Sequence, residues 1–496
     1  MAFFRSSIFI GIIFALLCCL LCILNTDSSI GFSGDDIQVI NQAVAAANNT
    51  VGQFIKDYSF MNANNVDPVA SNAYSWGTSF LLVPLYKLFG LNNIFAFKGV
   101  IIGAYCLFIF SFFIYLAHKT NRIIGGLITL FFATSPFFIG FTNDILKDLP
   151  YLLISFLSVV SIDYFLKESF LKKQIIYSIF VSSLLSLSVI FRENGALPVL
   201  VLFFAQLIKI SQLVISKKKI SHTAVILYGL PYIITAVVYT LISIKYPTFY
   251  LKGFIDFTPA SMIKMTGYYF NQFYLNFFAA GKIFSYILYC FVLVLSAYGI
   301  IKKVRHEYVL FIYLCTFIIY AAYPVEQEIR YIIPLIPVFF VFLGLGIYDF
   351  NNKYLKLTGI ITLVVLCLFN VFVLSKMNLT NRFLYKHTDN GTISSSAKKV
   401  YDYINKNIPA DSKIIYWHPR AIYLYTGRLS FQISDKKERL GEGDYQISII
   451  GKDRPGKYYD KEMYDLEAKT YIKEANVYLK PVYRNDNYAV YEIEKE

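Results

Sequence analysis

Acidic residues stand at two places where long apolar runs begin or end. Asp35 and Asp36 are adjacent in the stretch GFSGDDIQVI, and Asp144 and Asp148 lie close together in TNDILKDLP. A carboxylate can take a proton from an attacking hydroxyl group, and paired carboxylates can bind a hard cation through oxygen. These four residues are therefore candidates for acid–base chemistry or for ligand binding.

Basic residues stand at comparable places. Arg192 follows an apolar run in FRENG, and Arg330 precedes another in YPVEQEIRY. An arginine side chain can hold a phosphate group through two charge-assisted hydrogen bonds. A cavity that collected these arginines and the carboxylates would suit two reactants, one of which carries a phosphate.

The carboxylates also have a structural interpretation. Asp35 and Asp36 would be favourable in the first turn of a helix, where the unpaired N–H groups and the helix dipole favour negative charge. Either Asp144 or Asp148 would suit the start of a helix that contains Pro150. A pair of adjacent carboxylates nevertheless exceeds what one helix cap needs.

The arginines have structural alternatives of the same kind. Arg192 could form a local ion pair with Glu193, and exposed pairs of this kind add little stability. Arg330 could extend to lipid headgroups. The functional interpretation therefore requires that the acidic and basic residues meet in one place, although the sequence separates them widely.

The apolar runs identify the elements that must position these residues. The chain has 496 residues, 56% of them hydrophobic, and a mean hydropathy of +0.52. Its hydrophobic residues come in blocks near the length that a bilayer core requires, so we expect a polytopic α-helical membrane protein with about 11 transmembrane helices. The expected spans are 8–24, 93–117, 123–141, 149–166, 174–191, 196–214, 223–244, 283–301, 308–323, 331–348 and 356–375.

Charge sets the expected orientation in the cell membrane. The net charge of +14 resides mostly in alternate short loops, such as the one with Lys119 and Arg122, and the positive-inside rule makes those loops and the N-terminus cytoplasmic. Nucleic acid is therefore not an expected partner. The candidate residues fall on the outer side.

The first outer loop, 25–92, ends in SWGTSFLLVPLYKLFG, which predicts an interfacial helix interrupted by Pro84.

The composition changes after residue 375. Residues 1–375 form the expected transmembrane domain, and 376–496 an extracytoplasmic α/β domain of ordinary size. SSSAKKVYDYINKNIPADSKIIYW predicts a capped helix, a turn and a strand, and YQISIIG predicts a further strand. VYLKPVYRNDNYAVYEIE predicts a hairpin that turns at 485–487.

Cysteine and histidine give no cofactor signal. All seven cysteines lie inside apolar runs, where disulfides and thiolate metal sites are not expected. The five histidines lack metal-ligand spacing. No cofactor is predicted with certainty, and a divalent cation bound by the paired aspartates stays open.

The order of these features resembles the GT-C fold glycosyltransferases, such as the protein O-mannosyltransferases and the lipid A aminoarabinose transferase. An early acidic pair, an acidic second outer loop, an arginine after the fifth span and the late stretch RYIIPLIP occur in that order. A small outer domain containing AKKVYDYINKNIPADSKIIYWHPRAIYLYTGR completes the layout. The resemblance covers nearly the whole chain, although each motif is short.

This resemblance implies a function and residue roles. It implies transfer of a sugar, with inversion, from a polyprenyl-phosphate donor to a hydroxyl of a glycan, lipid or protein acceptor at the outer membrane face. Asp36 or Asp35 would be the general base. Asp148, or else Asp144, would bind the acceptor or a metal ion, and Arg330 would contact the donor phosphate or hold the site together.

One departure from the family leaves the phosphate ligand open. Several relatives carry a Lys-Pro-Pro stretch at the end of the first outer loop, where this chain has SNAYSWGTSF. Arg192, Lys147 or a lysine of the fourth outer loop, 245–282, could take the place of that lysine. The aromatic residues of the fourth loop also suggest a lid over bound lipid.

Three other functions agree less well with the pattern. A flippase or transporter would place ionisable residues near the bilayer midplane, on broken helices in paired repeats. A glycan polymerase or ligase would be organised around a large late outer loop, whereas the acidic pair here comes early. A non-enzymatic scaffold would leave the outer charged residues unexplained.

Overall fold

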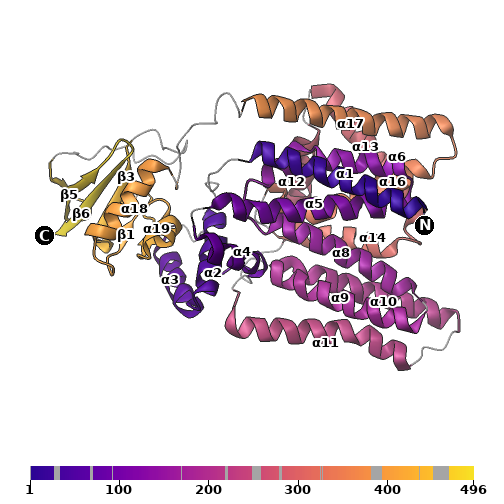
Figure 1. The fold of residues 1–496 in the computed structure, drawn as a ribbon, viewed down its shortest axis with the longest axis horizontal. Coiled ribbons are helices and arrows are strands. Elements are labelled where there is room, and N and C mark those ends of the chain that lie inside the picture. The colour runs from indigo at the N-terminus through magenta and orange to yellow at the C-terminus, as the bar shows by residue number, and fades with distance from the viewer. Residues whose placement is uncertain are drawn as a thin grey trace.

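The protein consists of a helical bundle and a small sheet domain. The computed structural model describes the chain except residues 1, 27–33, 67–70, 92, 169, 218–221, 249–257, 279–281, 324–325, 327, 381–391, 393, 435 and 451–467. The long helices lie side by side, with the sheet domain at one end of the bundle and the N-terminus at the other (Figure 1). The two ends of the chain therefore lie at opposite ends of the molecule.

Eight helices in the described part of the chain are long and apolar enough to cross a membrane. Their outward faces carry large exposed apolar side chains such as Phe9, Ile176 and Ile244, as expected of lipid-facing helices. The prediction of a multi-pass membrane protein is confirmed. The helices are α1 (Ala2–Asn25), α5 (Ile94–Lys119), α8 (Asp148–Lys167), α9 (Leu171–Phe191), α10 (Leu197–Ile215, preceded by the 3₁₀ turn η1, Glu193–Ala196), α11 (His222–Lys245), α13 (Lys282–Lys303) and α17 (Lys353–Thr380).

Three other expected spans are divided into shorter helices. They are α6 (Arg122–Ala133) with α7 (Pro136–Phe141), α14 (Tyr308–Cys315) with α15 (Phe317–Ala322), and the 3₁₀ turns η3 (Glu328–Tyr331) and η4 (Ile333–Leu335) with α16 (Ile336–Tyr348). Pro136, Pro334 and Pro337 each stand at the start of a new segment, because proline lacks the N–H group that would continue a preceding helix. The count of about 11 crossings therefore stays a prediction.

The first outer loop forms three helices outside the bundle. They are α2 (Gly34–Ala47), α3 (Val51–Asn64) and α4 (Gly77–Phe89, which contains Pro84), and they lie between the bundle and the sheet domain (Figure 1). Helix α2 packs on α4, and Ile40, Leu82 and Phe97 join α2, α4 and α5 in one buried apolar cluster. This packing holds the first turn of α2, which contains Asp35, at the end of the bundle.

The fourth outer loop differs from the expectation in its described part. Residues 259–277 form a helix, α12 (Pro259–Phe277), that begins with a capping box between Thr258 and Ser261. It packs against α15, and Met265 and Tyr269 on it are buried in the main apolar cluster. The described part of this loop is therefore a helix packed on the bundle, and residues 249–257 lie outside the described part.

The C-terminal residues form the predicted α/β domain. Helix α18 (Ser395–Asn407) is capped by Ser394. Six strands form one sheet of order β2-β1-β3-β6-β5-β4, in which β1, β2 and β3 are parallel and the remaining pairs are antiparallel. The predicted hairpin at 485–487 joins β5 and β6. The other elements are β1 (Ile414–Ile415), α19 (Pro419–Thr426), β2 (Ser430–Phe431), η6 (Lys437–Glu442), β3 (Tyr445–Ile449), β4 (Thr470–Ile472), β5 (Val477–Arg484) and β6 (Tyr488–Lys495).

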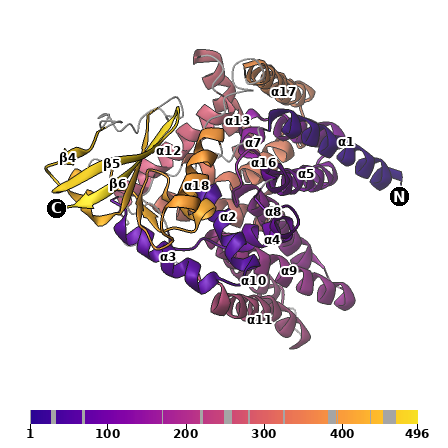
Figure 2. The ribbon, with the colours of Figure 1, turned by 60° about the vertical axis from the view of Figure 1, so that its left-hand side comes forward.

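The sheet domain packs on the helices of the first outer loop (Figure 2). Helix α19 lies against α2, where the Asn41 side chain donates to the backbone carbonyl of Arg420 at 3.1 Å. Tyr423 donates to Asp57 on α3 at 2.9 Å. Ala421 belongs to the same buried cluster as Ile40 of α2. Side chains of α19 can therefore reach the end of the bundle at which α2 lies.

Candidate active site

A polar pocket lies between the end of the bundle and α2. The residues that line it come from five separate stretches of the sequence, so only the folded chain creates it. Three of the predicted cations, Lys147, Arg192 and Arg330, are among them. Among the described residues, the lining is Asp35, Val39, Tyr74, Leu146, Lys147, Arg192, Glu193, Arg330 and Tyr331.

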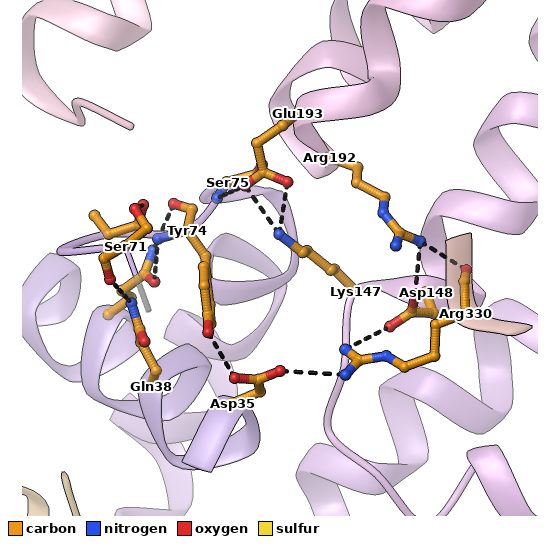
Figure 3. A network of polar contacts seen from close by, with 12 residues as sticks. Asp35, Gln38, Ser71, Tyr74, Ser75, Lys147, Asp148, Arg192, Glu193 and Arg330 are labelled. Atoms are coloured by element: carbon orange, nitrogen blue, oxygen red, sulfur yellow. Dashed lines mark hydrogen bonds and ion pairs between the residues drawn. The ribbon is translucent and has the colours of Figure 1, made fainter. Parts of the chain in front are cut away.

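Asp35 is held by three donors. Its Oδ1 atom accepts from the Tyr74 hydroxyl at 2.6 Å and from Arg420 Nη1 at 3.4 Å, and its Oδ2 atom accepts from Arg330 Nη1 at 3.2 Å. Figure 3 shows the contacts with Tyr74 and Arg330. The side chain remains 31% exposed, so the carboxylate is firmly positioned and still accessible from the pocket.

Asp148 lies deeper and joins the two predicted arginines. Arg192 Nη1 lies 2.6 Å from Asp148 Oδ1, and Arg330 Nη2 lies 3.3 Å from Asp148 Oδ2. Asp148 is fully buried and Arg192 nearly so, whereas Arg330 keeps 23% of its side chain exposed. Arg330 thus bridges the two carboxylates Asp35 and Asp148 (Figure 3).

Local backbone features present both arginines to the pocket. Arg192 has an extended backbone between α9 and η1, and a Cβ at Gly195 would lie 1.9 Å from the Ser188 carbonyl oxygen. Glycine therefore permits the tight turn of FRENG. Arg330 lies in η3, directly before the proline-interrupted segments that lead into α16.

Lys147 pairs with Glu193. Its Nζ atom lies 2.9 Å and 2.7 Å from the two carboxylate oxygens, and it lies 4.6 Å from the centre of the Tyr74 ring. Glu193 also accepts from the backbone N–H of Ser75 at 3.0 Å. The local Arg192–Glu193 pair considered from the sequence is thus replaced by two longer-range pairs, Lys147 with Glu193 and Arg192 with Asp148.

Neither of the two other predicted carboxylates is among the described residues that line the pocket. Asp36 is fully buried in α2 and does not line the pocket. Asp144 lies in the turn after α7, where its backbone N–H donates to the Phe141 carbonyl. Within each pair that the sequence left open, the geometry favours one member: Asp35 over Asp36 and Asp148 over Asp144.

The charges of this network nearly balance. In the part of this network that the structure describes, four cations, Lys147, Arg192, Arg330 and Arg420, contact three anions, Asp35, Asp148 and Glu193. Burial opposes ionisation of Asp35, but Arg420, Arg330 and the Tyr74 hydroxyl outweigh it and hold the pKa of Asp35 below its ordinary value. The remaining positive charge makes the pocket suitable for a singly charged anion.

Sequence reasoning missed Tyr74, Glu193 and Arg420 as members of this network. Tyr74 and Glu193 lie in stretches that the sequence did single out, SNAYSWGTSF and FRENG, but no local signal gives either residue a contact with Asp35 or Lys147. Arg420 comes from the sheet domain, 385 residues from its partner Asp35. No spacing within the chain could have predicted that contact.

An apolar cavity of about 390 Å³ lies beside the polar pocket, among α12, α13, α15 and α16. Tyr331 lines the polar pocket and the next residue, Ile332, lines the apolar cavity, so the two spaces are neighbours. The cavity lining is Tyr269, Phe270, Phe273, Leu293, Ala297, Ile300, Leu314, Phe317, Ile332, Leu335, Ile336 and Phe339.

The residues present do not suit a divalent cation. The described part of the chain contains no group of three or more His, Cys, Asp or Glu side chains that could hold a metal ion. Asp35 and Asp148 are instead neutralised by guanidinium groups, which a cation would have to displace.

Comparison with known proteins gives structural but not sequence matches. No family model matches the sequence, and no curated protein gives a significant match. The structure is similar to ArnT from Cupriavidus metallidurans in the apo state, with 11% identity, 97% coverage of each chain and a TM-score of 0.59. The same protein bound to undecaprenyl phosphate gives 10% identity, 97% coverage of each chain and a TM-score of 0.60.

A second protein shares the architecture. The oligosaccharyltransferase of Archaeoglobus fulgidus, in complex with Zn and sulfate, matches 89% of this chain and 68% of its own, with 10% identity and a TM-score of 0.56. At such low sequence identity, structural similarity shows a shared fold and not a shared activity. The chain has the GT-C fold that ArnT and this oligosaccharyltransferase share.

Proposed function

We propose that this protein is an integral-membrane glycosyltransferase that moves a sugar from a polyprenyl-phosphate donor to an acceptor hydroxyl. The observation that carries the proposal is the contact of Arg330 with both Asp35 and Asp148, in a pocket next to an apolar cavity. A carboxylate base, phosphate-binding cations and space for an isoprenoid chain are thereby neighbours. The known structure of ArnT with undecaprenyl phosphate supports the same class of donor.

The donor has two chemically different ends, and the site offers a suitable surface to each. A sugar–phosphate–polyprenyl diester carries one negative charge, which matches the positive charge left over in the network of seven ionised residues. Arg330 and Arg192 would contact the phosphate through charge-assisted hydrogen bonds. The polyprenyl chain would lie along the apolar cavity, whose lining is made almost entirely of carbon atoms of aromatic and aliphatic side chains.

The proposed reaction is a single displacement. The acceptor hydroxyl oxygen attacks the anomeric carbon, its proton passes to an oxygen of Asp35, and the bond between the anomeric carbon and the phosphate oxygen breaks. The electron pair of that bond leaves with the phosphate, so polyprenyl phosphate is the second product. Attack opposite the leaving group inverts the anomeric configuration.

Arg330 has a particular part in this scheme. It now occupies Asp35 Oδ2, the carboxylate oxygen that neither Tyr74 nor Arg420 contacts. A donor phosphate that draws Arg330 toward itself would release Oδ2 for the acceptor hydroxyl. The base would then become available only when the donor is bound, which disfavours unproductive encounters with the acceptor alone.

The cellular orientation follows the charge pattern of the loops. We propose that the N-terminus is cytoplasmic and that the pocket and sheet domain face the outside of the cell membrane. A tag at the C-terminus of intact cells should then be accessible to a membrane-impermeant reagent, and a tag at the N-terminus should not. Protection of the C-terminal tag would contradict this orientation.

The proposal is tested by following the donor in cells. Lipid-linked sugars extracted from cells with and without the protein are compared by mass spectrometry, and one polyprenyl-phosphate sugar should accumulate when the protein is absent. The purified protein should consume that species and release polyprenyl phosphate. A purified protein that moves the intact lipid-linked sugar across a vesicle membrane without breaking it would instead identify a flippase.

A further inference from the structure

The sheet domain places one buried guanidinium group on the candidate catalytic carboxylate. Arg420, in the first turn of α19, has its Nη1 atom 3.4 Å from Asp35 Oδ1, and only 10% of its side chain is exposed. Its partner Asp35 belongs to a helix of the first outer loop, 385 residues earlier in the chain. The contact therefore links the two parts of the molecule at the site itself.

The position of Arg420 is well defined by its surroundings. Its backbone carbonyl accepts from Asn41 of α2 at 3.1 Å, and the next residue, Ala421, is fully buried in the apolar cluster shared by α2, α4 and α5. Gly34 supplies space on the other side, because a Cβ there would lie 3.1 Å from Arg420 Nη1. The guanidinium group is thus a buried part of the contact between α19 and α2, and not a side chain that reaches Asp35 through solvent.

We propose that Arg420 is a positioning residue for the transfer reaction: together with the Tyr74 hydroxyl it holds Asp35 Oδ1, so that Oδ2 faces the reactants as the basic oxygen. This inference rests on the proposed function. It also gives the sheet domain a direct part in catalysis, because the domain completes the site as well as covering it. A base that is displaced by about 1 Å can lose on the order of 10²-fold in rate.

The pH profile separates this role from a merely structural one. The charged and titratable groups that face Asp35 are Arg420, Arg330, Tyr74 and Lys147, and Arg420 and Arg330 are the strongest influences that favour its ionised form. Activity needs ionised Asp35, so it falls as the pH drops through the pKa of this group. Without Arg420 that pKa rises, so activity should fall at a higher pH than in the wild type.

The test compares Arg420→Gln with two control variants. Arg428→Gln removes an equally buried arginine whose hydrogen bonds, to Pro409, Asn405, Thr426 and Ile408, all stay within the sheet domain. Tyr423→Phe removes the hydrogen bond to Asp57 that also docks α19. The assay is transfer from lipid extracted from cells that lack the protein, measured as kcat/KM against pH for the full-length detergent-purified protein.

We expect Arg420→Gln to lose on the order of 10²-fold in kcat/KM and to shift the acid limb of the profile to higher pH. Both controls should keep the acid limb at its wild-type position. Suppose that the wild type transfers sugar and Asp35→Asn does not. An unshifted acid limb in Arg420→Gln would then overturn the positioning role but not the proposed function. A wild type that transfers no sugar from the extract would overturn the proposed function instead.

Arg420→Lys provides the test if Arg420→Gln does not fold. An ammonium group keeps the positive charge but lacks the planar fork of the guanidinium group. We expect reduced turnover with the acid limb retained near its wild-type position. Wild-type turnover in Arg420→Lys, with Asp35→Asn inactive, would show that the geometry of this contact is irrelevant to the reaction.

Discussion

Asp35 and Arg330 are 295 residues apart in the chain, and their side chains meet at 3.2 Å. The carboxylate begins a helix of the first outer loop, and the guanidinium group lies in a 3₁₀ turn before the proline-interrupted entry to α16. Arg330 also reaches Asp148 at 3.3 Å. One side chain therefore joins the proposed base to the buried anion that holds both Arg192 and Arg330.

Replacement of Asp35 should remove the proposed base. We expect Asp35→Asn to lower turnover by about 10²–10⁴-fold, the usual contribution of general-base catalysis, while the protein remains folded because the amide keeps the shape of the carboxylate. Turnover is measured on the purified protein with its lipid-linked donor. Asp36→Asn is the matched comparison, since Asp36 is buried and outside the pocket: it should lower thermal stability more than turnover. The reverse pattern would identify Asp36 as the base.

Replacement of Arg330 should weaken recognition of the phosphate. Charge-assisted hydrogen bonds contribute about 1.5–3 kcal/mol, so Arg330→Ala should bind undecaprenyl phosphate about 10- to 100-fold more weakly. Binding of undecaprenol, which lacks the phosphate, should change little in the same titration. Lys480→Ala removes a solvent-exposed partner of Glu492 in the sheet domain and should leave both affinities unchanged. An equal loss for both ligands would place Arg330 outside the phosphate contact.

Replacement of Asp148 should destabilise the fold. Asp148 is fully buried between Arg192 and Arg330, and removal of one partner of a buried ion pair costs about 3–5 kcal/mol. We expect a clear decrease in the Tm of Asp148→Asn in detergent. Asp349→Asn breaks the more exposed pair with Lys303 and should cost about 0–1 kcal/mol. An unchanged Tm in Asp148→Asn would mean that another anion holds the two arginines.

Filling the apolar cavity should discriminate against long isoprenoid chains. Ala297 of α13 lines the cavity, so Ala297→Phe should raise KM for a long-chain donor and leave KM for a short-chain analogue of the same sugar phosphate nearly unchanged. Val294→Phe, on the same helix but 64% exposed, should affect neither donor. A uniform change in KM for both chain lengths would exclude the cavity as the binding site of the chain.

Much of the fold was predictable because each element depends on local patterns. Apolar blocks long enough for a bilayer identified the eight long helices, and the turn residues at 485–487 placed the hairpin of β5 and β6. Prolines divide two of the three other expected spans into shorter segments, and the third is divided at Thr316. The helix at 259–277 was missed because its polar and aromatic residues suggested a loop, whereas packing against α15 supports a helix.

The sequence by itself determined which side chains could form a site and at which end of the helices they lie. Charge at a membrane boundary is costly unless it is paired or used, so Arg192, Arg330 and the two acidic pairs, Asp35 with Asp36 and Asp144 with Asp148, were identifiable from the sequence. Only the tertiary structure decided their partners. A helix turns its side chains by about 100° per residue, so Asp35 and Asp36 point in different directions, and the packing of α2 on the bundle selects Asp35. The contact of Arg420 with that carboxylate exists only because the sheet domain docks on α2.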